Sequence, residues 1–164
     1  MNRAGKYTTR LQAGLGLVDE TQRLLGLYRE GMRPQDLYQA ALDSGLFPTL
    51  TARRMRNIVI EGFAPRYMNP PSVALTLREL AERFEPPEFL QLLLLYTARA
   101  NLILADFIRQ VFWPRYSAGR GDLLRQDAVA FVQAAVQDGK TQRPWSQGTI
   151  GRVASYLLGT CTDF

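Results

Sequence analysis

Apolar side chains recur every three or four positions along most of the chain, which is the spacing of one face of an α-helix. No segment alternates apolar and polar residues as a half-buried strand does, and no internal repeat or low-complexity segment stands out. The pattern predicts an all-α protein. The predicted helices cover residues 17–31, 34–43, 51–63, 75–84, 87–113, 123–137 and 149–158.

Residues with known positional preferences mark where these helices begin. Asp19 and Glu20 fall in the first turn of the first helix, where the helix dipole favours acids. Pro34 occupies the first-turn position that proline prefers in the second helix. Thr51 or Thr49 can cap the third helix through a side-chain oxygen.

The strongest helix breaker is the run NPPS at residues 69–72. At this length the chain is expected to form one domain. We therefore predict a single all-helical domain, residues 1–164, in which the breaker separates two lobes. The N-terminal lobe covers about residues 1–68 and the C-terminal lobe about residues 69–164.

The longest predicted helix, residues 87–113, is almost entirely apolar in its first half. It predicts a long central helix on which the others pack, in a compact multi-helix bundle. Its most apolar part, residues 89–96, is too short to cross a bilayer, and Arg99, Asp106 and Arg109 follow on the same helix. A buried core helix is a better interpretation than a membrane span.

Two features indicate a cytoplasmic protein without a membrane partner. No apolar segment follows the early charges, so no signal peptide is predicted. The single cysteine, Cys161, excludes an internal disulfide and agrees with a reducing compartment.

The residue types needed for catalysis are scarce. Histidine, the commonest general base and metal ligand, is absent from the sequence. One cysteine cannot form a thiolate zinc site, and no phosphate-binding glycine loop occurs. We expect no enzyme activity, no metal and no cofactor. The acidic clusters, Asp19-Glu20 and Glu79, Glu82 and Glu85, are typical of solvated helix faces.

Net charge is +5, with 18 arginines and 2 lysines supplying the positive charge. Residues 1–66 hold 10 basic and 6 acidic side chains (+4), whereas residues 67–164 hold 10 and 9 (+1). The arginine excess can reflect the base composition of the genome. It also suits phosphate recognition, because the planar guanidinium donates two parallel hydrogen bonds.

The stretch TARRMRN, residues 51–57, places three arginines just before the apolar run IVI. At 100° per residue, Arg53 points away from the apolar stripe of this helix, and Arg54 and Arg56 flank the stripe on opposite sides. Two interpretations remain open: a solvated helix face, or a surface that contacts nucleic-acid phosphates.

Other basic positions extend the candidate set beyond this triplet. Trp145 lies in a loop beside Arg143 and either covers the core or stacks on a ligand. The candidate nucleic-acid contacts are Arg53, Arg54, Arg56, Arg66, Lys6, Arg10, Lys140, Arg143 and Arg152.

Four blocks of the sequence together resemble the BrxA family of the BREX bacteriophage-exclusion systems of bacteria. They cover nearly the whole chain in the family's order. The blocks are YTTRLQAGLGLVDETQRLLGLYREG (7–31), SGLFPTLTARRMRNIVIEGFAPRY (44–67), LADFIRQVFWPRY (104–116) and PWSQGTIGRVASYLLGTCTDF (144–164).

This resemblance implies an all-helical fold similar to the antitermination factor NusB, and double-stranded DNA binding without known catalytic activity. It implies other BREX proteins as partners, since the family's gene cluster also encodes a methyltransferase, an ATPase and a phosphatase-like protein. The binding role carries over to Arg53, Arg54 and Arg56, and secondarily to the region 140–152. Two alternatives stay open: a protein–protein adaptor without direct DNA contact, and RNA binding by analogy with NusB.

Overall fold

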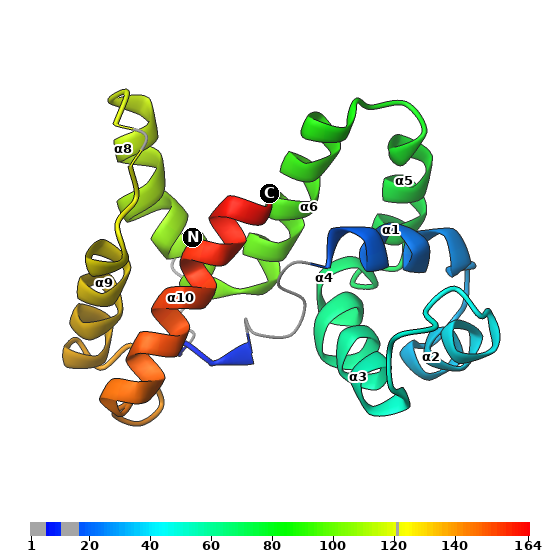
Figure 1. Cartoon of the computed structure of the whole chain (residues 1–164), viewed down its shortest axis with the longest axis horizontal. Helices are drawn as coiled ribbons and strands as arrows, with labels where there is room; N and C mark the ends of the chain where they lie inside the picture. Colours follow the sequence, from blue (N-terminus) through cyan, green and yellow to red (C-terminus); the bar gives the residue numbers. More distant parts are fainter. Residues whose placement is uncertain (1–5, 11–16, 121) are drawn as a thin grey trace. The chain divides into compact units, whose positions relative to one another are not determined.

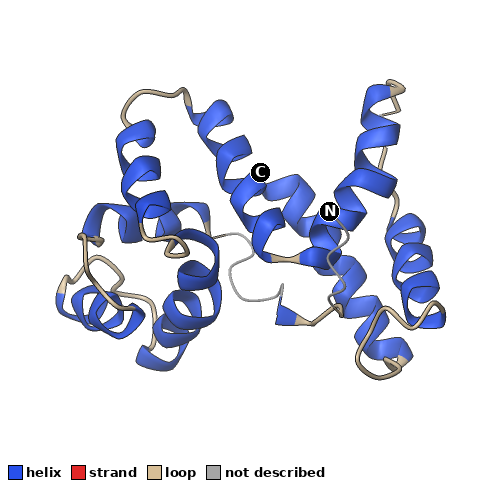
Figure 2. Cartoon of the chain, turned by 180° about the vertical axis from the view of Figure 1, so that it is seen from behind, coloured by secondary structure: helices blue, strands red, loops and turns tan. Residues whose placement is uncertain are grey.

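The computed structural model describes residues 6–10, 17–120 and 122–164, and every regular element in those ranges is helical (Figures 1 and 2). Extended backbone pairs there only at an isolated bridge between Tyr7 and Thr141. The all-α prediction is therefore confirmed. The chain forms two compact units, which we call unit 1 (Met1–Leu15 and Thr97–Asp163) and unit 2 (Gly16–Tyr96 and Phe164).

Unit 2 buries one continuous apolar cluster to which each of its long helices contributes. Leu24, Leu37, Val59, Ala74 and Leu93 are fully buried members of that cluster. The predicted apolar stripes thus face a common core. The elements are α1 (Val18–Leu27), α2 (Pro34–Asp43), α3 (Ala52–Arg56), the π-helical segment η2 (Asn57–Phe63), α4 (Ala64–Tyr67), α5 (Ser72–Ala81) and the first part of α6 (Pro86–Ala100).

Unit 1 packs its last two long helices along one another. Ala128, Val132 and Ala135 of one helix, and Val153 and Leu157 of the other, are buried. The unit's elements are α7 (Leu102–Phe107), the π-helical segment η3 (Ile108–Phe112), α8 (Trp113–Ser117), α9 (Arg125–Gln137) and α10 (Gln147–Asp163).

Tyr7 attaches the N-terminal segment to the rest of unit 1. Its backbone N–H donates to the carbonyl oxygen of Lys140 at 2.7 Å, and its hydroxyl donates to Asp106 Oδ2 at 2.6 Å. Its ring is buried and stacks on Phe131 of α9, which also contacts Phe107 of α7 edge-on. The side chain and the backbone of Tyr7 together therefore join residues 6–10 to α7, α9 and the loop before α10.

Side-chain caps begin helices α2, α3 and α9, and the sequence predicted the one at α3. Thr51 Oγ1 accepts a hydrogen bond from the backbone N–H of Arg54 at 3.2 Å, so Thr51 is the cap of α3. At α2 the carboxylate of Asp36 accepts from the N–H of Arg33, and its bond to the Arg33 guanidinium lowers the pKa of Asp36 to about 2. Asp127 accepts from the N–H of Leu124 in the same way at α9.

Two helices contain a wide π-helical stretch just before a proline, and both carry the motif F-x-P-R-Y. The first copy is residues 63–67, where η2 precedes Pro65, and the second is residues 112–116, where η3 precedes Pro114. Proline has no N–H to donate, and its ring collides with the carbonyl one turn earlier. A π-helical turn makes room for that ring without ending the helix. This short repeat was not identified from the sequence.

The long central helix predicted over residues 87–113 is wrong, because the structure breaks it at Asn101. That residue is extended (φ −127°, ψ 101°), and its side-chain amide donates to the carbonyl oxygen of Thr97 at 3.1 Å. Asparagine competes with helical hydrogen bonds in this way and favours the N-cap position, from which α7 starts.

Other predictions also need correction. The residues between the predicted helices 87–113 and 123–137 do not form a loop throughout, since α8 occupies Trp113–Ser117. Phe84 and Leu124, apolar residues of the predicted helices 75–84 and 123–137, are exposed and do not join the core. The predicted lobe boundary at residues 69–72 differs from the division of the structure, which falls within α6. The reason is that α5 and the first half of α6 bury their apolar side chains in the same core as α1 to α4.

No single helix of the described residues is long and apolar enough to cross a membrane. The helices Pro86–Ala100 and Leu102–Ser117 reach that length and apolarity only when the two are counted together across their break.

We predict that Tyr7→Phe destabilises the protein by about 1.5–3 kcal/mol, the usual contribution of a hydrogen bond to a charged group. Burial, with the bond to Asp106, raises the pKa of Tyr7 above its ordinary value of about 10. The hydroxyl therefore stabilises the fold fully below pH ~10, and this contribution is lost as pH rises above that value. Urea denaturation followed by circular dichroism from pH 7 to 11 measures both effects.

Tyr116→Phe is the matched control, because the Tyr116 side chain is exposed. Equal stabilities of the two variants at pH 7 would contradict the role given to Tyr7.

Candidate nucleic-acid interface

The predicted basic residues fall into two groups on different units. Arg53, Arg54, Arg56 and Arg66 belong to unit 2, whereas Lys6, Arg10, Lys140, Arg143 and Arg152 belong to unit 1.

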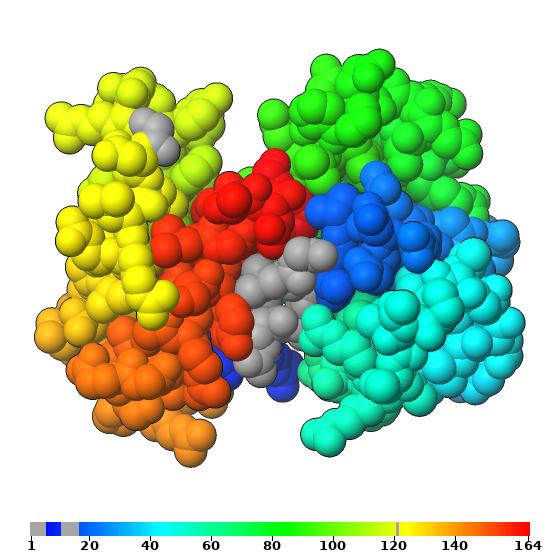
Figure 3. Space-filling view, in the orientation of Figure 1, coloured from blue at the N-terminus to red at the C-terminus, as the bar shows by residue number. Residues whose placement is uncertain are grey.

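The three arginines of α3 lie on the surface of unit 2, in the turquoise region of Figure 3. Met55, between them, is buried in the core and fixes which side of the helix faces inward. Within the described part of the chain, none of the three guanidinium groups forms a hydrogen bond or an ion pair with another residue. All three are available to an anion from outside the protein.

The position of these arginines opposes the helix dipole. The first turn of a helix carries partial positive charge, which favours acids there and disfavours cations. Helices α1, α2 and α9 follow this rule with acidic residues in their first turns, but α3 has none and holds three arginines in five residues. This arrangement costs some stability, and bound anions would relieve the repulsion.

Arg66 differs from the triplet because its side chain is only 5 % exposed. Burial lowers the pKa of its guanidinium, and a hydrogen bond with Tyr67 opposes that shift. Seven of the residues between Met55 and Arg66 are π-helical (Asn57–Phe63), so the regular spacing of an α-helix does not relate the two positions. Arg66 does not lie on the surface that carries the triplet.

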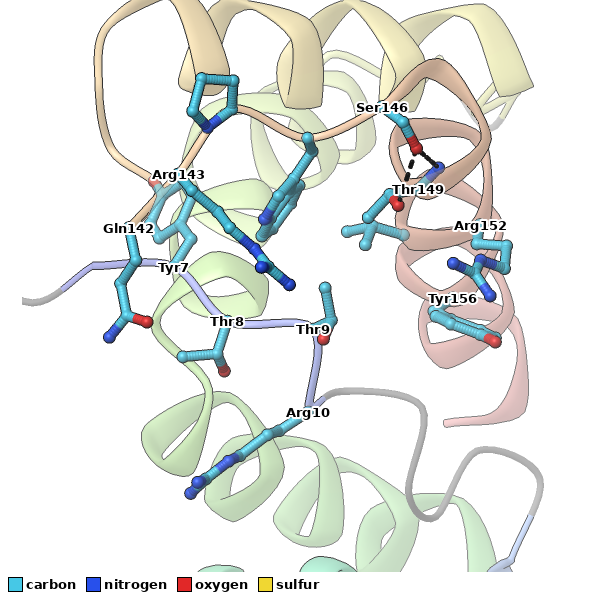
Figure 4. Close-up of a pocket in the computed structure, with 13 residues that line it drawn as sticks. Tyr7, Thr8, Thr9, Arg10, Gln142, Arg143, Ser146, Thr149, Arg152 and Tyr156 are labelled. Atoms are coloured by element: carbon cyan, nitrogen blue, oxygen red, sulfur yellow. Dashed lines mark hydrogen bonds between the residues drawn. The ribbon is translucent and has the colours of Figure 1, made fainter.

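The basic residues of unit 1, distant in the sequence, meet around one pocket of about 840 Å³ (Figure 4). Arg10 contributes from the N-terminal segment, Arg143 from the loop before α10, and Arg152 from α10 itself. Figure 4 shows Arg143 and Arg152 reaching in from different walls, with Arg10 extending away from both. Among the described residues that line the pocket, none is acidic.

Lys6 and Lys140 are used mainly to hold this region together. The Lys6 ammonium donates to the carbonyl oxygen of Gly139, and Lys140 Nζ lies 3.9 Å from Asp138 Oδ2. The Lys6–Gly139 and Tyr7–Lys140 hydrogen bonds hold the N-terminal segment against the loop before α10, whereas the Lys140–Asp138 pair lies within that loop.

The pocket also contains residues that sequence reasoning did not select. Thr8, Thr9, Ser146, Thr149 and Tyr156 bring hydroxyl groups to its wall. These residues form no recognisable sequence motif. They come together because the segment at Tyr7 pairs with the segment at Thr141. Trp145, for which two roles stayed open, is half-buried and lines the same pocket.

Comparison with known protein families gives one match, the BrxA family, whose model aligns with residues 5–164. The aligned region takes in both units, the α3 arginines and the whole pocket. Neither the curated proteins nor the solved structures include a match. The all-helical fold is consistent with the expected likeness to NusB, which no solved structure here supports directly.

The contrast between Arg66 and the triplet yields a stability prediction. Arg66→Ala removes a buried side chain and leaves a cavity, so we expect a loss of about 2–4 kcal/mol in the free energy of unfolding. Arg53→Ala removes an exposed side chain without described partners and should change it by less than about 0.5 kcal/mol. Parallel urea titrations measure both. Similar values for the two variants would contradict the burial of Arg66.

Proposed function

This chain belongs to the BrxA family, and we propose that it acts as a duplex-DNA-binding protein without catalytic activity. Family membership makes it a component of a BREX phage-defence system. The observation that carries the DNA-binding proposal is the set of three exposed arginines on α3, free of described partners at a helix end that favours anions.

Phosphate contact explains this set better than base reading. Arg54 and Arg56 flank the buried stripe on opposite sides, so the three side chains spread over a broad surface instead of forming one narrow edge for a groove. Backbone phosphates are spread along a duplex and carry no sequence information. Binding of this kind tolerates most sequences and weakens steeply with salt, because each neutralised phosphate releases counterions.

We predict that the triple substitution of Arg53, Arg54 and Arg56 by glutamine weakens duplex binding without changing the helical content. The logarithm of the affinity decreases linearly with the logarithm of the salt concentration. If each arginine neutralises one phosphate, the substitution makes this negative slope shallower by up to about 2.7, roughly 0.9 for each contact. Gel-shift or fluorescence-anisotropy titrations of random-sequence duplex at several salt concentrations give that slope.

Arg83→Gln is the control in the same unit, since Arg83 is exposed and lies between Glu82 and Glu85. An unchanged slope in the folded triple variant would exclude α3 as the contact surface. Competition with single-stranded RNA in the same titration tests the alternative that RNA is the preferred ligand.

A second candidate function, protein–protein adaptor, is favoured by the exposed aromatic cluster of α8. In the first copy of F-x-P-R-Y both Phe63 and Tyr67 are buried in the core. In the second copy Trp113 is 56 % exposed and Tyr116 63 % exposed, with ring centroids 5.7 Å apart. Exposed tryptophan and tyrosine are enriched at the centres of protein interfaces.

We predict that Trp113→Ala with Tyr116→Ala reduces co-purification with the other BREX proteins and leaves duplex affinity unchanged. Removing an aromatic anchor from an interface commonly costs about 2 kcal/mol or more, roughly a thirtyfold loss of affinity. Pull-down of the co-expressed system, with Leu95→Ala as a control for another exposed apolar residue, measures the effect. Equal recovery of partners would count against this surface.

A further inference from the structure

The pocket of unit 1 combines positive charge, hydroxyl donors and an aromatic ring within about 840 Å³. Pockets that hold small ligands typically measure about 300–1,000 Å³. This is room for a single nucleotide, far less than a duplex occupies.

Its charge is unbalanced. Arg143 and Arg152 are exposed and form no hydrogen bond or ion pair with another described residue, and no carboxylate lines the wall. The basic residues next to the pocket are different, since Lys6 and Lys140 have partners. Two free guanidinium groups at one cavity repel each other, and a bound phosphate would bridge them through charge-assisted hydrogen bonds.

The positions of the two arginines are set by the fold. Arg152 stands on α10, whose start is capped by Ser146: its Oγ accepts from the N–H of Thr149 at 3.3 Å. Arg143 follows the segment that pairs with Tyr7. Because both supports are hydrogen-bonded, less ordering is needed when a ligand binds.

Hydroxyl groups supply further donors for phosphate oxygens. Thr8 and Thr9 are exposed in the wall, and Ser146 and Thr149 face the same space with their hydroxyl oxygens 3.1 Å apart (Figure 4). A phosphate group accepts several hydrogen bonds. This mixed set of arginine and hydroxyl donors therefore suits a phosphate ligand better than it suits a carboxylate or chloride ligand.

The aromatic component narrows the ligand class. Trp145 is half-buried in the pocket wall, two residues after Arg143. Indole rings stack on nucleobases, and such stacking tolerates any base because every base has a π face. A ligand that satisfies both parts carries a phosphate and a planar base.

We propose that this pocket binds a nucleoside monophosphate group, with Arg143 and Arg152 on the phosphate and Trp145 against the base. The group comes either from a free nucleotide or from the 5′-phosphorylated end of a DNA strand. The proposal does not rest on duplex binding by α3, which belongs to the other unit.

Trp145 is itself the reporter for the test. The chain has two tryptophans, so Trp113→Phe leaves Trp145 as the single tryptophan, which can be excited selectively over the tyrosines. In the full chain with this substitution, titration with AMP should quench the fluorescence. Adenosine should quench at least tenfold more weakly, because it lacks the phosphate, and inorganic phosphate should reverse the AMP effect by competition.

Added to that background, Arg143→Gln and Arg152→Gln should each weaken AMP binding roughly tenfold, the effect of losing one charge-assisted bond. Arg120→Gln, another exposed arginine of unit 1 outside the pocket, is the matched control and should bind AMP as before. Circular dichroism confirms that each variant is folded.

The outcomes separate cleanly. The site is overturned by absence of quenching at millimolar AMP, by equal binding of adenosine and AMP, or by arginine variants that bind as well as the control. Displacement of AMP by a 5′-phosphorylated oligonucleotide, and not by its 5′-hydroxyl counterpart, identifies strand ends as the source; displacement by neither identifies the free nucleotide. The α3 triple variant should keep AMP binding, so failure of duplex binding and failure of this site are distinguishable.

Discussion

Unit 1 depends on the side-chain and backbone contacts of one buried residue, Tyr7. Its backbone pairs with Lys140, its hydroxyl donates to Asp106, and its ring stacks on Phe131. Arg109 also binds the Asp106 carboxylate, so the aspartate has a cationic partner and a neutral donor. Without these contacts, residues 6–10 would not form a wall of the pocket. The candidate ligand site is therefore a product of the same interactions that hold the unit together.

Each unit contains a helix in which a π-helical turn precedes a proline. In each F-x-P-R-Y motif the proline continues the helix at the cost of one backbone hydrogen bond, and a π-helical turn precedes it. The surroundings then give the two copies opposite roles. Arg66 is buried in unit 2, whereas Arg115 of unit 1 forms an ion pair with Asp127 at 2.6 Å and the neighbouring aromatic rings stay exposed. The tyrosine of the motif is thus buried in one copy (Tyr67) and exposed in the other (Tyr116).

The positive charge of the protein divides into structural and available parts. Arg78 donates to the carbonyl oxygen of Tyr28 just beyond the end of α1, and Arg125 donates to Ser155 of α10. Such arginines satisfy groups within the fold and add little to an external field. The side chains of the α3 triplet, Arg143 and Arg152 form no hydrogen bond or ion pair with another described residue. Neighbouring cations without partners repel one another and raise the free energy of the unliganded protein. These arginines are therefore the side chains from which a bound anion would gain most.

The sequence by itself determined the helical class, most helix positions and the buried stripes, because 3.6-residue periodicity and capping residues act over short distances. It also placed Arg53, Arg54 and Arg56 outside the core, since Met55 and Val59 fix the phase of that helix. Only the tertiary structure decided the extent of each unit and the meeting of Arg10, Arg143 and Arg152. That meeting depends on the hydrogen bond between Tyr7 and Lys140, more than 100 positions apart in the sequence, and no local pattern encodes such a pairing.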